Sequence, residues 1–180
     1  MSDHFFFEFI HALAYFSDSI FVGLKIFVPV IFLLHILKIH FGKVKFDSIV
    51  STVNLLLLFG GILFLVTIIS NTWRTWNSEN DFEREMIVSI VTGPQWFQVI
   101  IPVFSYGLLP HVMWIRKFRN SIYSSFIIVI FWILKYFFIA YLSNITAHLK
   151  FSINEYWEKA VLFMVILAAF YFIQSRRSKE

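Results

Sequence analysis

The sequence predicts an all-α integral membrane protein with about five transmembrane helices in a bundle, and three observations support this. The chain has 180 residues, of which 59% are hydrophobic and only 14% charged, whereas a soluble domain carries about 25% charged residues. Its apolar residues fall into runs long enough for a spanning helix, which needs roughly 20 residues. Tryptophans and cationic clusters mark the ends of these runs, as is typical of membrane interfaces and cytoplasmic loops.

The N-terminal residues differ from the runs that follow. Residues 1–18 are rich in phenylalanine but are interrupted by Glu8 and two histidines, which favours a short helix lying in the membrane interface. We therefore expect an interfacial N-terminal segment (1–18), a single helical membrane domain (19–174) and a basic cytoplasmic tail (175–180).

The predicted spans follow in order along the membrane domain. The first contains Pro29, which a spanning helix tolerates. The second contains Gly60-Gly61, where the absence of side chains allows another helix to approach closely. A polar loop at 72–95 comes next, and the spacing of its apolar residues predicts an amphipathic helix over 82–91 on the membrane surface. The five predicted spans are 19–39, 49–71, 96–115, 122–142 and 156–173.

The distribution of cations predicts the orientation. Lysines and arginines follow the first, third and fifth spans, whereas most acidic residues lie at the other ends of the spans. Because cytoplasmic loops carry an excess of Lys and Arg, we expect the N-terminus outside and the C-terminus in the cytoplasm. The cationic groups are Lys38, Lys43 and Lys45; Arg116, Lys117 and Arg119; and Arg176, Arg177 and Lys179.

Composition also excludes several functions. The chain has no cysteine, so it forms no disulfide and offers no thiolate to an iron–sulfur cluster or a haem. Its net charge of +4 belongs to cations beside hydrophobic ends, so no nucleic-acid partner is expected. The second, third and fourth predicted spans carry no Asp or Glu at depth, which disfavours a proton or ion translocator.

Four side chains are candidates for ligand binding. Lys25 and Lys135 could each hold a quinone or lipid headgroup, or could extend toward the interface. His35 and His111 should lie at one depth, where they could contact a quinone or ligate a b-type haem. Alternatively, His35 reaches the interface and His111 caps backbone groups freed near Pro110. The candidate quinone-binding residues are therefore His35, His111 and Lys135, and no metal site is predicted.

Three blocks of sequence resemble the second helical bundle of NrfD-like membrane proteins, which include the membrane subunits of polysulfide reductase and of alternative complex III. The family pattern is a Trp-Tyr-Ser-Gly-Asn-x-Tyr-Glu external loop, a Gly-Pro-Tyr turn, a span, and a Pro-Gln-x-x-Trp-x-Lys-Lys-x-Arg exit. The matching residues are Trp76, Ser78, Asn80, Phe82, Glu83, Gly93, Pro94, Pro110, Trp114, Lys117 and Arg119.

The chain departs from the family at the quinol site. Asn71 stands where the family has a glutamate, and Val66 and Ile68 stand at tyrosine positions. The fourth predicted span has no acid near Lys135, where the family carries a Glu-Arg pair. The family has a glutamine at the position of His111, which disfavours a haem ligand. The first bundle of the family is absent.

The resemblance implies an accessory or structural membrane subunit of a multi-subunit respiratory complex in the bacterial inner membrane, with a bundle that has lost its quinol site. A working quinone-binding anchor, a b-type haem anchor and a small transporter are the alternatives. No cofactor is assigned to the chain, and a quinone or a lipid is the candidate ligand. The implied partners are lipids, other membrane subunits and extracytoplasmic redox subunits. We expect Trp76, Phe82, Met86 and Ile90 to contact a partner.

Overall fold

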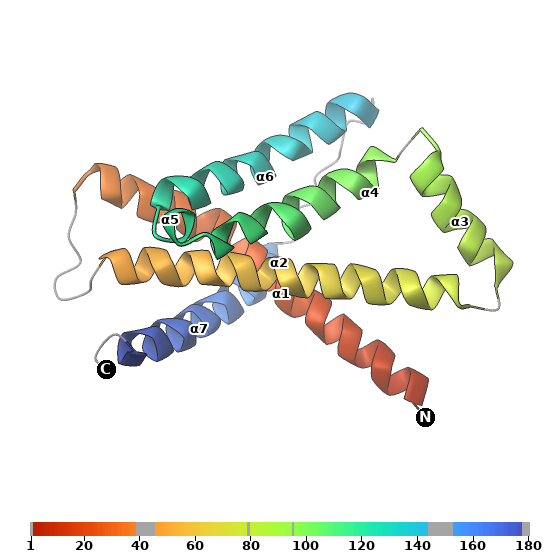
Figure 1. Ribbon diagram of the computed structural model, residues 1–180, viewed down its shortest axis with the longest axis horizontal. Helices are drawn as coiled ribbons and strands as arrows, with labels where there is room; N and C mark the ends of the chain where they lie inside the picture. Colours follow the sequence, from red (N-terminus) through yellow and green to blue (C-terminus); the bar gives the residue numbers. More distant parts are fainter. Residues whose placement is uncertain (1, 39–45, 79, 95, 144–152, 178–180) are drawn as a thin grey trace.

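The computed structural model describes residues 2–38, 46–78, 80–94, 96–143 and 153–177, which form helices and short turns without any strand (Figure 1). The predicted all-α fold is confirmed for this part of the chain. In chain order the elements are α1 (Ser2–Ile36), α2 (Phe46–Trp76), α3 (Asp81–Thr92), α4 (Phe97–Pro102), the π-helical η1 (Val103–Leu108), the 3-10 helix η2 (Leu109–Trp114), α5 (Arg116–Arg119), α6 (Ile122–Ser143) and α7 (Ile153–Arg177).

Four helical stretches are long and apolar enough to cross a membrane, so by length and composition the chain is a helical transmembrane protein. The bounds of α6 agree with the predicted fourth span to within one residue. Within α6, however, the apolar stretch with described side chains is the shorter Ile122–Lys135. The four long stretches are Phe5–Ile36, Phe46–Trp76, Phe97–Trp114 and Tyr156–Ile173.

The N-terminal half of α1 differs from the prediction. The structure has one continuous helix here, so the separate short interfacial helix expected over the first 18 residues is wrong. Two serines close to the expected boundary have hydrogen-bond partners within the packed structure. The Ser19 hydroxyl donates to the Tyr15 carbonyl at 2.7 Å, and the Ser17 hydroxyl donates to the Gly60 carbonyl of α2 at 3.1 Å. Polar residues therefore continue the helix instead of ending it.

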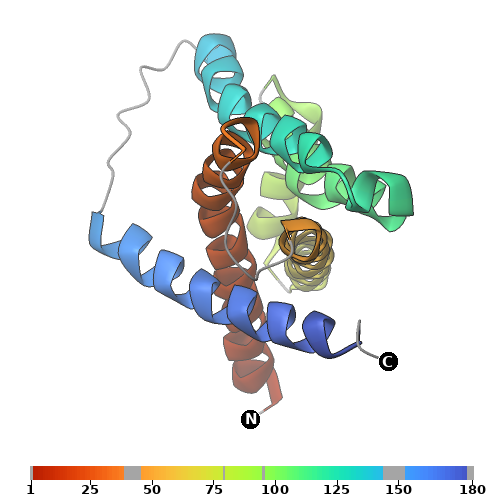
Figure 2. The same cartoon turned by 90° about the vertical axis from the view of Figure 1, so that its left-hand side faces the viewer.

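The helix α2 lies at the centre of the molecule, and α1, η1, η2 and α7 all pack against it. Figure 2 views α2 nearly end-on and shows α7 running across the view, so these helices cross steeply instead of standing parallel. The two chain termini lie toward opposite ends of the long axis in Figure 1.

The glycine pair of α2 lies where two neighbours approach closely. A Cβ atom added at Gly60 would lie 3.0 Å from Ile20 Cγ2 of α1, and one at Gly61 would lie 2.9 Å from Pro110 Cβ of η2. The two glycines thus allow α1 and η2 to approach α2 closely at adjacent positions. This confirms the close approach predicted for Gly60-Gly61.

A second close crossing joins α1 to α7. The ring of Phe163 lies directly over Gly23, so that an added Cβ would be 1.9 Å from Phe163 Cγ. About one turn away on each helix, Lys159 Nζ pairs with Asp18 Oδ2 at 2.5 Å. The sequence alone did not predict this ion pair.

Candidate functional site

The two intramembrane lysines meet at one aromatic ring. The ammonium nitrogen of Lys135 lies 3.3 Å from the centroid of the Tyr106 ring, and that of Lys25 lies 5.2 Å from the same centroid. A cation within about 6 Å of a ring centroid is attracted by the negative face of the ring. Lys25 belongs to α1, Tyr106 to η1 and Lys135 to α6. We call these three residues the Tyr106 site.

Aromatic side chains enclose the Tyr106 site. The ring centroids of Phe21, Trp132 and Phe64 lie 4.8, 5.0 and 5.7 Å from that of Tyr106. Tyr106 is 7% exposed and Lys135 is 6% exposed, so the Lys135 side chain turns into the protein and does not extend toward the interface. Interactions between a cation and an aromatic ring are stronger in such desolvated surroundings.

The backbone that carries Tyr106 is a π-helical turn, a feature frequent at functional sites. The Leu109 N–H donates to the Phe104 carbonyl, five residues back. The corresponding partner for the Ser105 carbonyl would be Pro110, which has no N–H. The Trp132 indole N–H donates to this carbonyl instead, at 2.6 Å. One hydrogen bond therefore satisfies a freed acceptor and fixes α6 against η1.

His111 satisfies a second carbonyl near Pro110. Its Nδ1 lies 2.8 Å from the Gly107 carbonyl oxygen, which in a 3-10 helix would accept from the N–H that Pro110 lacks. This is the backbone role expected as the alternative to quinone contact. The bond involves Nδ1 alone, so the ring can still interact through Nε2.

His35 makes contacts of another kind. Its exposed ring stacks on Phe46 of α2 with 4.9 Å between the centroids and meets Tyr123 of α6 edge-on at 6.1 Å. Within the described part of the chain, no contact joins this ring to His111. The two histidines predicted to share one depth are therefore not brought together by any described interaction.

The predicted partner-contact residues lie at the end of α2 and on α3. The Asn80 side chain accepts a hydrogen bond from the Phe82 N–H and so caps α3. All residues of α3 are described, and none of them is buried. Trp76, Phe82 and Met86 are 53%, 72% and 47% exposed, and Ile90 is partly buried. The spacing of Phe82, Met86 and Ile90 puts them on one side of the helix.

Sequence reasoning missed the residues around the two lysines. Tyr106 and Ser105 form a polar pair inside an apolar run, which was an available signal. Trp132 lies well inside the predicted fourth span, whereas interfacial tryptophans lie at span ends. A tryptophan at that depth needs a partner for its N–H, and the Ser105 carbonyl is that partner.

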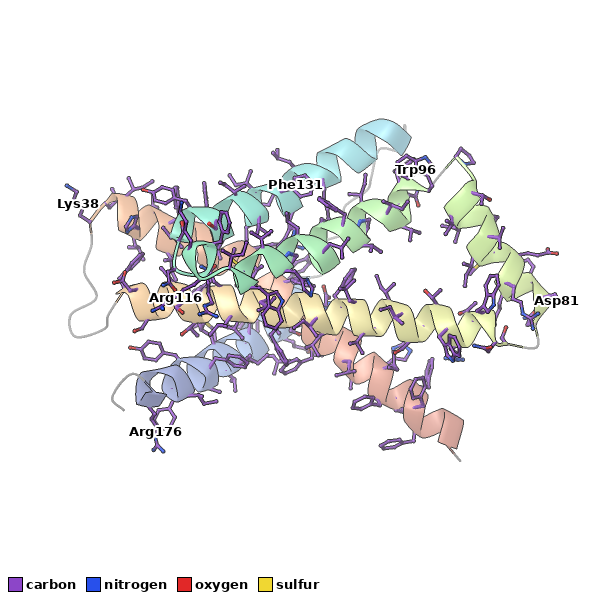
Figure 3. The ribbon with its side chains drawn as sticks, viewed as in Figure 1. Lys38, Asp81, Trp96, Arg116, Phe131 and Arg176 are labelled. Carbon is purple, nitrogen blue, oxygen red and sulfur yellow. The ribbon has the colours of Figure 1, made fainter. Side chains whose placement is uncertain are left out.

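The blocks that resemble NrfD-like proteins lie at opposite ends of the molecule. Figure 3 shows Asp81 and Trp96 at one end and Arg116 at the other, together with Lys38 and Arg176. Any helical segment that runs the length of the molecule between the second and third blocks would separate them in this way. No family model, no curated protein and no solved structure matches this chain.

Proposed function

We propose that this chain is an accessory membrane subunit of a multi-subunit respiratory complex in the bacterial inner membrane. The main support is a set of exposed side chains, Trp76 at the end of α2 and Phe82, Met86 and Ile90 along one side of α3, which we call the docking face. Three of these side chains are at least 47% exposed. Tryptophan and other aromatic residues are enriched in protein contact surfaces and often dominate their binding energy.

Polar interactions hold α3 in place beneath the docking face. The guanidinium of Arg84 donates to the Ser78 carbonyl through Nε at 3.1 Å and through Nη2 at 2.6 Å. Its Nη1 lies 3.6 Å from the carboxylate of Asp81. An isolated helix of 12 residues is only marginally stable in water. The interactions with the preceding loop therefore pre-form the docking face, which lowers the entropy cost of binding.

The docking face could instead contact the surface of the membrane. Helices that lie on membranes are usually rich in Lys and Arg on their polar face. In contrast, α3 carries Asp81, Glu83 and Glu85 against the single cation Arg84. Anionic headgroups would repel this helix, and the acidic rim favours a protein partner that presents basic residues.

Charge also supports the proposed topology of five spans. Lys38, Arg116 and Arg176 lie at one end of the molecule, while Asp81 and the N-terminus lie toward the other (Figures 1 and 3). The excess of cations in cytoplasmic loops assigns the basic end to the cytoplasm and α3 to the outside. An odd number of spans would place the termini on opposite sides, and α6 is the crossing that brings the four long stretches to five.

The double variant Trp76→Ala with Phe82→Ala tests the docking face. The tagged chain would be purified from native membranes in a mild detergent, and the proteins that accompany it would be identified. We expect the variant to lose its partners, because it removes the two most exposed aromatic side chains of the docking face. The partners should keep most of their quinol oxidation.

A matched control removes one exposed tryptophan and one exposed phenylalanine elsewhere. Trp157 and Phe131 are 71% and 39% exposed, and their joint replacement by alanine should retain the partners. Retention of the same partners by the docking-face variant would contradict the proposed contact. A wild-type chain that co-purifies with no other protein would contradict the proposed function as a subunit.

The Tyr106 site supports a second candidate, a working quinone-binding anchor. Two ammonium groups that converge from α1 and α6 would attract the electron-rich carbonyl oxygen of a quinone. Lys135→Met or His111→Ala would then abolish quinol oxidation in a complex that remains fully assembled, whereas an accessory subunit would leave the activity intact. A Soret band that disappears on His35→Ala or His111→Ala would instead indicate a b-type haem anchor.

A further inference from the structure

A groove of about 350 Å³ lies between α2, η2 and α7, separate from the Tyr106 site and the docking face. All its lining side chains are hydrophobic, and its volume is at the lower end of the range for small-molecule sites. Leu55, Leu58 and Ile62 line it from α2, Trp114 from η2, and Phe170 and Ile173 from α7.

The groove is elongated along α2. Leu55 and Ile62 are seven residues apart, which corresponds to roughly 10 Å of helix axis at 1.5 Å per residue. Because the lining is apolar over this length, the groove suits a flexible hydrocarbon chain better than a polar ring system.

Two arginines follow groove-lining residues along the chain. Trp114 is two residues before Arg116 in α5, and Ile173 is one helical turn before Arg176 in α7. Figure 3 shows Arg116 and Arg176 at the same end of the molecule. The Arg176 guanidinium lies 4.4 Å from the ring centroid of Phe172, which keeps it beside its own helix. The apolar groove therefore has Trp114 and Ile173 toward the end of the molecule that carries both arginines.

A buried asparagine holds the segment that carries Arg116. Asn54, which precedes the groove residue Leu55, is fully buried, and its side-chain amide donates to the carbonyls of Arg119 and Ser121 at 2.6 and 3.2 Å. The backbone after η2 is thereby tied to α2 next to the groove. The position of the arginine-bearing segment is thus set before any ligand binds.

We propose that this groove holds an acyl chain of an anionic phospholipid whose phosphate is bound by Arg116 and Arg176. The guanidinium fork matches the geometry of phosphate oxygens. Trp114 is 65% exposed, and a tryptophan close to a cationic cluster is typical of the headgroup region. Because both arginines are positively charged, they favour a headgroup with net negative charge over a zwitterionic one. This inference does not depend on which complex the chain joins.

Quenching of tryptophan fluorescence by brominated lipids tests the proposal. The full chain would be reconstituted in dioleoylphosphatidylcholine vesicles that contain increasing fractions of phosphatidylglycerol or phosphatidylcholine with dibrominated chains. The difference between wild type and Trp114→Phe isolates the signal of Trp114. We expect half-maximal quenching at a several-fold lower fraction of the brominated phosphatidylglycerol.

Arginine variants identify the source of this preference. Arg116→Gln with Arg176→Gln should reduce the preference for phosphatidylglycerol by about fivefold per arginine. This factor corresponds to roughly 1 kcal/mol per basic residue near a membrane surface. Lysine at both positions keeps the charge and should retain most of the preference. The control Arg74→Gln with Arg84→Gln removes two cations near the opposite end and should leave the preference unchanged.

Three outcomes would overturn the proposal. Equal quenching of Trp114 by the two brominated lipids would show contact with bulk bilayer only. Absence of Trp114 quenching by either lipid would show that another copy of this chain covers the groove. A preference for phosphatidylglycerol that survives in the glutamine variant would also refute the assignment of the phosphate to Arg116 and Arg176.

Discussion

Replacement of Gly23 by alanine should weaken the contact between α1 and α7. The new Cβ would lie 1.9 Å from Phe163 Cγ and 2.3 and 2.4 Å from its two Cδ atoms. These atoms are at the base of a ring that is only 2% exposed, so a small rotation of the ring tip cannot relieve the overlap. Either the Phe163 side chain leaves its position or the two helices move apart.

The cost follows from ordinary packing distances. Non-bonded carbon atoms are optimally separated by about 3.5–4.0 Å, so the atoms must separate by roughly 2 Å. Inserting an extra carbon into a packed core costs about 1–3 kcal/mol of stability. An overlap this large should cost an amount near the upper end of that range. Replacing a helical glycine by alanine contributes about 1 kcal/mol in the opposite direction. We therefore expect Gly23→Ala to lower the free energy of unfolding by about 2 kcal/mol.

Gly60→Ala is the matched control, because it changes the same residue type within another helix of the core. Its added Cβ would lie 3.0 Å from Ile20 Cγ2 and 3.1 Å from Phe21 Cε1, so these side chains would have to shift by only a few tenths of an ångström. The gain in helix propensity is common to both variants and cancels in the comparison. Reversible unfolding in mixed detergent micelles, followed by circular dichroism, measures the difference.

A Gly23→Ala variant as stable as Gly60→Ala would refute the close crossing of α1 and α7. A companion variant, Gly23→Ala with Phe163→Leu, separates overlap from other causes. Leucine lacks the planar ring that covers Gly23, so the second substitution should recover part of the lost stability. Failure of this recovery would show that the loss does not arise from contact with Phe163.

Two further predictions concern topology and the ion pair between α1 and α7. An impermeant thiol reagent applied to intact cells should label Ser78→Cys and spare Asn120→Cys in this cysteine-free chain, and the reverse pattern would invert the proposed orientation. Asp18→Asn should lower stability by about 1–2 kcal/mol, because it removes the carboxylate from a Lys159 side chain that is only 11% exposed, and Lys159→Met in the same chain should recover most of that loss. A double variant no more stable than Asp18→Asn alone, in the same micelle assay, would contradict this pairing.

Local composition was sufficient to predict the helices and the close contacts of Gly60-Gly61. A run of about 20 apolar residues can satisfy its backbone in a bilayer only as a helix, and a glycine pair lacks side chains whatever approaches it. The wrong boundary after residue 18 has a tertiary cause. The Ser17 hydroxyl donates a hydrogen bond to the Gly60 carbonyl of another helix, and no sequence pattern predicts that acceptor.

Helix composition alone did not reveal which intramembrane side chains meet. Lys25 and Lys135 could be assigned a depth from their positions along the predicted spans. Their directions around the helix axes could not be assigned, because a membrane helix is apolar both toward lipid and toward its neighbours. The convergence of both lysines on Tyr106 therefore depends on tertiary packing.

The sequence by itself determined that Pro110 frees backbone acceptors in the third predicted span, because proline has no N–H. Only the tertiary structure decided how they are satisfied, with His111 bonding to one carbonyl within the same turn and Trp132 reaching another from α6. The physical reason is that a missing donor is a local covalent property. Its replacement depends on which side chains the packed helices bring within hydrogen-bonding distance.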